Sequence, residues 1–202
     1  MKHLFKPLVL GLAFTLHATT ASALEEIKGS VFQILNQVEL NADGQNELKR
    51  FRAAPAAYGS MYVSRDGSTG AWRSDQFSLA MARKLSETIC RQVAQGPCVE
   101  IARAVPRNSV GAVAIPKRAQ SDFRNAIRET TSGRYAAFAA HGMGGWGFGS
   151  NFNNLDEART RAVLECQASS ARDRAKHDKS RRQAFERAGL YNCAIIYTIQ
   201  KK

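Results

Sequence analysis

The chain has 202 residues, 29 of them Lys or Arg against 17 Asp or Glu, which gives a formal net charge of +12. This length is enough to bury a hydrophobic core, in one domain or in two small ones. The positive surplus favours anionic partners such as nucleic acid, lipid headgroups or an acidic polysaccharide, although composition does not separate recognition from a gain in solubility. Because the first cysteine is Cys90, a lipid-modified cysteine near the N-terminus is excluded.

Residues 1–23 have the pattern of a secretory signal peptide. Lys2 and Lys6 precede an apolar run, and Ala21 and Ala23 have the spacing that a signal peptidase accepts. The apolar run, about ten residues long, falls well short of the roughly 20 residues of a membrane-spanning helix. We therefore predict cleavage after Ala23, no transmembrane segment in the mature chain, and a periplasmic or secreted location.

Residues 24–55 are expected to form an N-terminal helical arm. Apolar residues recur at helical spacing from Ile27 to Val38, and the turn-forming residues 41–44 separate them from a second short helical stretch at 47–52. We expect the arm to pack on the rest of the chain. The alternative is an exposed amphipathic arm that docks elsewhere.

Two later segments, residues 58–90 and 135–166, resemble each other. Each begins with a strand-like run after a Tyr, passes through a Gly-rich turn to a Trp, and ends in a helical pattern closed by a Cys. The small and apolar residues of the two helices have the same spacing, which places each set on one face: Leu79, Ala82, Ser86 and Cys90, and Leu155, Ala158, Ala162 and Cys166.

The predicted fold is therefore α+β, with two tandem repeats that each contain a small antiparallel sheet, a packed helix and one disulfide. The repeats are expected at 56–118 and 133–202, with a connector at 119–132. In the first repeat, residues 98–105 and 110–115 read as a hairpin. The second repeat lacks this return strand, which leaves open that both repeats contribute to one sheet.

Four cysteines in an exported chain are expected to pair as disulfides. Cys90 and Cys166 each end a helix, whereas Cys98 and Cys193 each begin an apolar strand-like run. We therefore predict the pairs Cys90–Cys98 and Cys166–Cys193. A metal site is the competing interpretation, but the chain has no Cys-x-x-Cys motif and only four His, so we expect no metal and no other cofactor.

These residues carry a family resemblance. A Gly-rich turn with Trp, a helix ending in Cys and a second Cys opening a strand, occurring singly or in tandem, resembles the bacterial family called domain of unknown function 4189. The resemblance covers roughly residues 56–115 and 133–198. It implies export and an α+β fold, but no settled activity and no catalytic residues.

His141 begins the segment His-Gly-Met-Gly-Gly, which is similar to the oxyanion segment of esterases. With Ser150 and Asp156 nearby in the sequence, it suggests an exported hydrolase as the alternative function. However, no Gly-x-Ser-x-Gly motif is present, and the first repeat has Ser64 at the corresponding position. The simpler interpretation is that His141 ends a strand and the glycines shape a turn, so an enzymatic function is not favoured.

Trp72 and Trp146 are candidate ligand-binding residues, since an aromatic ring in a Gly-rich turn can stack on a sugar or a base. We favour the interpretation that both are core residues. The Gly-rich turns have neither the Lys-Ser/Thr of a phosphate-binding loop nor the spacing of a dinucleotide fingerprint.

Residues 169–189, between the cysteines of the second repeat, form a basic insertion with seven cations and three acids. If helical, it can present cations to an anionic polymer, and its candidate binding residues are Arg172, Arg174, Lys179, Arg181 and Arg182. No aromatic residue interrupts residues 172–182, so recognition of single strands by stacking, and specific nucleic-acid recognition in general, are not expected. A solvated helix face without a partner is the alternative.

The sequence thus predicts a secreted or periplasmic basic module that binds at the cell envelope. The expected partners are an anionic envelope polymer, a membrane surface or another protein, and the sequence makes no prediction of oligomeric state.

Overall fold

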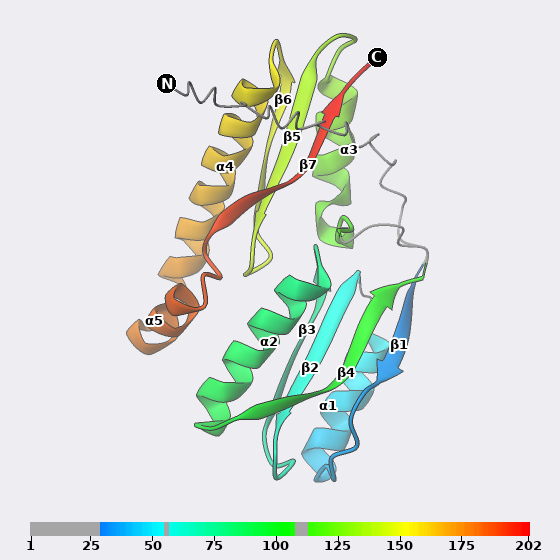
Figure 1. Cartoon of the computed structure of the whole chain (residues 1–202), viewed down its shortest axis with the longest axis vertical. Coiled ribbons are helices and arrows are strands. Elements are labelled where there is room, and N and C mark those ends of the chain that lie inside the picture. Colours follow the sequence, from blue (N-terminus) through cyan, green and yellow to red (C-terminus); the bar gives the residue numbers. More distant parts are fainter. Residues whose placement is uncertain (1–28, 55–56, 108–112) are drawn as a thin grey trace, which may run out of the picture.

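The computed structural model of the protein describes residues 29–54, 57–107 and 113–202. The predicted signal peptide and the first residues of the arm lie outside the described residues. The fold is α+β, with two antiparallel sheets, one in the lower part and one in the upper part of Figure 1. As predicted, each sheet belongs to one of two similar halves of the chain, and each half contains one disulfide.

The first half contains a four-stranded sheet of order β1-β4-β2-β3. Its elements in chain order are β1 (Ser30–Ile34), α1 (Ala42–Ala53), β2 (Tyr58–Ser64), β3 (Gly70–Gln76), α2 (Leu79–Ala94) and β4 (Cys98–Pro106).

The second half contains a three-stranded sheet of order β6-β5-β7. After a short 3-10 turn, η1 (Lys117–Ala119), its elements are α3 (Gln120–Glu129), β5 (Tyr135–His141), β6 (Trp146–Phe152), α4 (Leu155–Ala175), α5 (Lys179–Arg187) and β7 (Cys193–Gln200).

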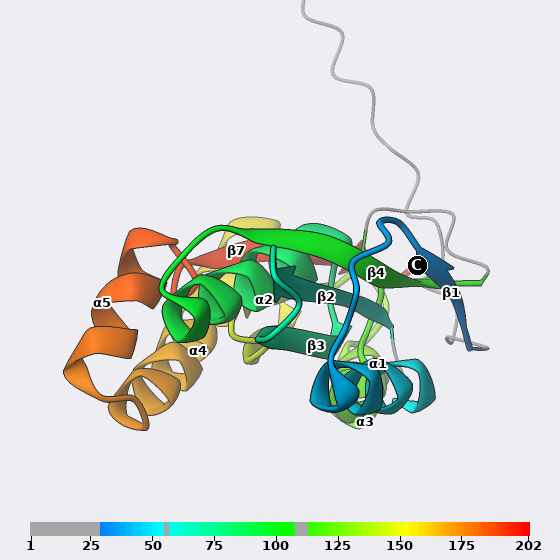
Figure 2. The same ribbon diagram turned by 90° about the horizontal axis from the view of Figure 1, so that it is seen from below.

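The repeated unit is larger than the sequence pattern predicts. Each hairpin, β2–β3 or β5–β6, is preceded by a helix that packs against it, α1 in the first half and α3 in the second. The predicted connector therefore holds the counterpart of α1. Figure 2 shows α1 and α3 on one side of the sheets and α2 and α4 on the other. The hairpins also share their irregularities, since the register shifts after Tyr58 in one and after Tyr135 in the other.

The N-terminal segment differs from the prediction. The second helical stretch lies within α1, whose first turn is capped by Asn41, as the turn-forming residues suggest. Residues 30–34, however, form strand β1, which pairs antiparallel with β4. The helical spacing of its apolar residues is overridden because β4 offers unpaired backbone groups, which a strand can satisfy and a helix cannot.

Strand β1 also takes the place expected for the return strand of the first repeat. The described part of that segment, residues 113–115, is not a strand, and residues 110–112 lie outside the described residues. Within the described residues, no strand of one sheet is hydrogen-bonded to a strand of the other, so the repeats there do not share one sheet.

Small residues set the distance between α4 and its sheet. A Cβ on Gly147 would lie 2.2 Å from the backbone nitrogen of Cys166, and one on Gly149 would lie 2.4 Å from the carbonyl oxygen of Ala158. Ala158, Ala162 and Cys166 are fully buried in this contact. The predicted face of small residues therefore allows the helix to lie directly on the backbone of β6.

The disulfides join Cys90 to Cys98 and Cys166 to Cys193, as predicted. Each connects the helix of its half to the strand that follows. Cys98 lies opposite Ser64 in the β2–β4 ladder, and Cys193 lies opposite His141 in the β5–β7 ladder. His141 and Ser64 are therefore equivalent positions, as the sequence alignment indicates.

The two halves contact each other through apolar side chains. Phe77, which follows β3, packs against Phe138 of β5, with ring centroids 6.2 Å apart. Leu85 of α2 is buried together with Phe185 of α5 and with Leu190. The basic insertion thus reaches the first half and covers part of α2.

Candidate functional site

Trp72 and Trp146 each donate an indole N–H hydrogen bond to a carboxylate on the preceding helix. Trp72 Nε1 lies 2.8 Å from Glu47 Oε2 of α1, and Trp146 Nε1 lies 3.1 Å from Asp122 Oδ2 of α3. Both rings are partly buried and pack on their core clusters. These contacts support the interpretation of both residues as core residues rather than as a stacking platform.

The two Trp residues do not occupy equivalent positions, although each follows the Gly-rich turn of its repeat in the sequence. Trp72 lies opposite Met61, and the corresponding pair in the second half is Phe148 and Phe138. Trp146 is two residues earlier in its strand and lies opposite Ala140. Because side chains two residues apart in a strand share a face, each half can still place one Trp against its helix.

His141 ends β5 and is fully buried. Neither ring nitrogen has a hydrogen-bond partner within the described residues, and the nearest charge is Asp173 of α4, with Oδ2 3.6 Å from Nε2. The turn that follows closes over the ring, because a Cβ on Gly145 would lie 2.3 Å from His141 Nε2 and 2.4 Å from Ser169 Oγ. The glycine at this position is therefore required by the close approach of the turn to the imidazole.

Burial lowers the pKa of His141 below its ordinary value, and the positive charge of Arg118 acts in the same direction. The carboxylate of Asp173 and the nearby backbone of Leu190 oppose them and raise the pKa, but burial is the larger influence. The folded protein thus holds His141 as a neutral imidazole near neutral pH.

This burial makes stability depend on pH. Because the pKa of His141 is lower in the folded than in the unfolded chain, the unfolded chain binds more protons as pH falls. The contribution of the neutral His141 imidazole to the free energy of unfolding is present in full above its pKa of 6.5 in the unfolded chain. This contribution is lost as the pH falls toward the pKa of His141 in the folded chain. We expect the free energy of unfolding, measured in urea between pH 5 and pH 7, to decrease less for His141→Ser than for the wild type. Asp173→Asn should instead enlarge the decrease, and an unchanged pH profile for His141→Ser would contradict the assignment.

The hydrolase constellation suggested by the sequence is not formed. Asp156 lies in the first turn of α4 with its side chain 90% exposed and ion-paired to Arg159, whereas His141 faces the opposite end of that helix. Asp156 and Asp173 are 17 residues apart on α4, which is about 26 Å along the helix axis. Ser150 Oγ donates to Glu129 Oε2, 3.4 Å away.

The polar neighbours of His141 are Ser169 and Asp173, which the sequence analysis missed. Their separation of four residues, which places them on one face of a helix, was the available signal. The carboxylate of Asp173 lies on the Nε2 side of His141, whereas a Ser-His-Asp triad needs the acid on Nδ1 and the nucleophile on Nε2. The arrangement therefore lacks the geometry of a serine hydrolase.

Arg118 connects this turn to the first half. Its guanidinium donates to the carbonyl oxygen of Gly144 at 3.0 Å and to the carbonyl oxygen of Asp75 at 2.5 Å. It also lies over the Trp146 ring, 5.9 Å from the centroid. The Gly-rich turn of the predicted oxyanion segment is thus part of the contact between the halves.

The basic insertion is helical, as predicted, and forms the end of α4 and all of α5. Each of its three acids is ion-paired with one of its cations: Asp173 with Lys176, Asp178 with Arg181, and Glu186 with Arg174. The remaining four cations, Arg172, Lys179, Arg182 and Arg187, are exposed and have no acidic partner in the part of the chain that the structure describes.

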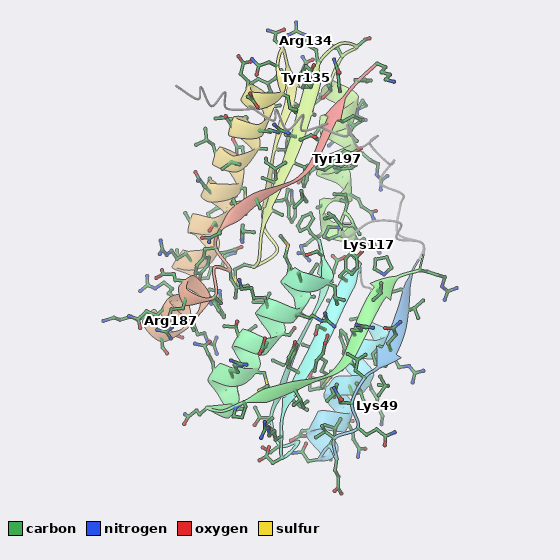
Figure 3. All side chains as sticks on the ribbon, in the orientation of Figure 1. Lys49, Lys117, Arg134, Tyr135, Arg187 and Tyr197 are labelled. Carbon is green, nitrogen blue, oxygen red and sulfur yellow. A yellow bond between two sulfur atoms is a disulfide. The ribbon has the colours of Figure 1, made fainter. Side chains whose placement is uncertain are left out.

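We call these four residues the basic surface. They come from the last turns of α4 and from α5, which lie together at the outer edge of the molecule in Figure 3, where Arg187 is labelled. Helix α5 is held there by Phe185, which is buried against Leu85 of α2, and by a 3.4 Å hydrogen bond from Gln92 Nε2 to the carbonyl oxygen of Ser180. The insertion is therefore not a free extension, because its apolar side is anchored on both halves.

The chain matches no protein family model, no curated protein and no solved structure. Within residues 29–54, 57–107 and 113–202, no group of three or more His, Cys, Asp or Glu residues could hold a metal ion. Over the same ranges, none of the helices is long and apolar enough to cross a membrane.

Proposed function

We propose that this protein is an exported binding module that recognises an anionic polymer of the cell envelope through the basic surface. The observation that carries the proposal is the charge balance of the insertion. Its acids are all used in ion pairs with neighbouring cations, and four exposed cations are left to contact a partner. An anchored helix pair also presents these charges in a fixed arrangement, which lowers the entropic cost of binding.

An anionic polymer fits this surface better than a membrane. A helix that lies in a membrane interface needs an exposed apolar face, with residues such as Phe or Leu. The large apolar residue of α5, Phe185, is instead buried in the contact with α2 and Leu190. Helix α5 therefore offers charge without an apolar face. Two disulfides are compatible with an oxidising compartment, where such polymers are found.

The proposal predicts salt-dependent binding. The quadruple variant combines Arg172→Gln, Lys179→Gln, Arg182→Gln and Arg187→Gln. With dextran sulfate as the probe, its affinity at low salt should be roughly tenfold or more lower than that of the wild type. It should also have a shallower dependence of affinity on salt, because fewer counterions are released. Titration of the mature protein at several salt concentrations measures both quantities.

The matched control removes the same charge from elsewhere, in the variant Lys49→Gln, Arg65→Gln, Arg107→Gln, Lys117→Gln. Lys49 and Lys117 lie away from Arg187 in Figure 3. Equal losses in the two variants would mean that net charge alone determines the affinity and would contradict a localised surface. Salt-independent binding by the wild type would contradict the proposal as a whole.

A further inference from the structure

The two halves differ at one edge of their sheets. In the first half, β4 has a hydrogen-bonded neighbour on each side, β1 and β2. Its counterpart in the second half, β7, pairs with β5 and, in the described part of the chain, has no strand on its other side. The second sheet thus has the arrangement of the first with the fourth strand left out, as Figure 1 shows.

The burial of the two strands reflects this difference. Five of the nine residues of β4 are buried, whereas none of the eight residues of β7 is. Strand β7 contains no charged residue, and three of its eight residues are Ile. Edge strands of natural proteins usually carry charges or proline that prevent pairing with other chains. An uncharged apolar edge of this length is suited to bind another strand.

Strand β1 shows what the missing strand supplies. It pairs antiparallel with β4 over five residues. Its Phe32 points toward α1, where its ring centroid lies 5.6 Å from that of Phe51. One aromatic side chain thus fills the space between the added strand and the helix.

The corresponding space in the second half is nearly filled, because the apolar cavity between α3 and β7 has a volume of only about 10 Å³, enough for at most one water molecule. Its lining includes Phe123 and Ile127 of α3, and Tyr197 and Ile199 of β7. The ring of Tyr197, labelled in Figure 3, lies 5.5 Å from that of Phe123. The second half therefore offers both parts of a strand-binding site, an unpaired backbone edge and, beside it, an apolar surface of α3 and β7 side chains.

We propose that the open edge of β7 binds an extended segment of a partner protein, which adds as an antiparallel fourth strand. The segment has β-branched residues around one aromatic residue, and the aromatic side chain packs on the apolar surface that α3 and β7 form. Because the strands are antiparallel, the N-terminal end of the segment lies beside Lys201 and Lys202, which favours acidic residues there. This mode of recognition takes its affinity from main-chain hydrogen bonds and its specificity from side-chain contacts.

A second copy of the chain fits this site less well. Two segments of this chain have the required pattern, β1 and β7 itself. Strand β1 is already bonded to β4, and the N-terminal end of β7 carries no acidic residue to lie beside Lys201 and Lys202 of another copy. Each copy also carries a formal charge of +12, which opposes self-association. The site does not depend on the basic surface, so the two proposals can fail separately.

The probe is a fluorescent peptide that carries the β1 sequence behind two acidic residues, Asp-Asp-Ser-Val-Phe-Gln-Ile, titrated into the full mature protein with its disulfides intact. We expect saturable binding that weakens at least tenfold when the Phe is replaced by Ala. Two further peptides are N-methylated at every second residue, offset from each other by one residue. One should no longer bind and the other should bind normally, because only every second N–H of an added strand faces β7. Absence of binding by the unmethylated peptide, or equal effects of the two methylation patterns, would overturn the proposal.

Amide hydrogen exchange then locates the peptide without any substitution in the protein. The peptide should slow exchange at alternate amides of β7 and leave β1 and β4 unchanged. Slower exchange at β4 would mean that the peptide displaces β1, which counts against the site. Protected amides along the outer edge of β7 without peptide would also overturn the proposal: protection lost on dilution indicates a second copy, and protection that persists indicates that the chain itself covers the edge.

Discussion

Replacing Cys166 and Cys193 together by Ala is expected to lower the free energy of unfolding by about 3.6 kcal/mol, against about 2.6 kcal/mol for the same change at Cys90 and Cys98. The difference follows from the loops that the bonds close, whose ends are 27 and 8 residues apart in the sequence. A longer loop loses more entropy in the unfolded chain when it is cross-linked. Urea unfolding of the two double variants, without reducing agent, measures both values.

The two disulfide variants serve as controls for each other, because each leaves the bond of the other half intact. The second half also carries α5 and its contact with α2, so loss of its disulfide should expose more of the chain to early unfolding. A larger effect from the Cys90–Cys98 pair would mean that the folded structure, and not the unfolded chain, determines the difference.

Trp146→Ala is expected to lower the free energy of unfolding by about 3 kcal/mol, at the lower end of the range for large aromatic residues because the ring is partly exposed. The substitution removes the packing of the ring on Phe77, 6.2 Å away between centroids, and the hydrogen bond to Asp122. Since Phe77 belongs to the first half, the change should also weaken the contact between the halves. Equilibrium unfolding followed by circular dichroism provides the measurement.

Trp146→Phe is the matched control. It keeps an aromatic ring and removes the N–H donor, so it should cost about 1 kcal/mol, the net value of one hydrogen bond. Trp72→Ala tests the equivalent contact with Glu47 in the first half. Wild-type stability in both Ala variants would contradict a core role and would favour the ligand-platform interpretation.

The features that distinguish the second half from the first lie close together. His141 replaces the equivalent Ser64, and the basic insertion supplies Asp173, the charge nearest to the imidazole. In the first half, Ser64 Oγ instead donates to Asp66 Oδ1 within its own hairpin turn. The buried His141 is thus in direct contact with α4, the helix that carries part of the basic surface. Protonation of His141 should therefore affect that surface.

Much of the fold follows from local patterns in the sequence. The helix faces of α2 and α4 were predictable because small residues recur at helical spacing, and the disulfides were predictable because each pair joins a helix end to a strand start. The helical nature of the basic insertion and its excess of cations were also visible. These features depend on residues close together in the chain, where periodicity and spacing carry the information.

Other features were decided by the tertiary structure alone. Residues 30–34 form a strand because β4 leaves a backbone edge to pair with, and helical spacing within the segment contains no information about that edge. The two Trp residues are two positions out of register because strand pairing, not the Gly-rich turn, determines which residues lie opposite each other. His141 meets Asp173 rather than Asp156 because the long helix α4 runs about 26 Å between these two residues, so nearness in sequence does not correspond to nearness in space. Local chemistry therefore determined the elements and their covalent links, whereas the pairing of distant backbone segments determined the partners of the candidate site residues.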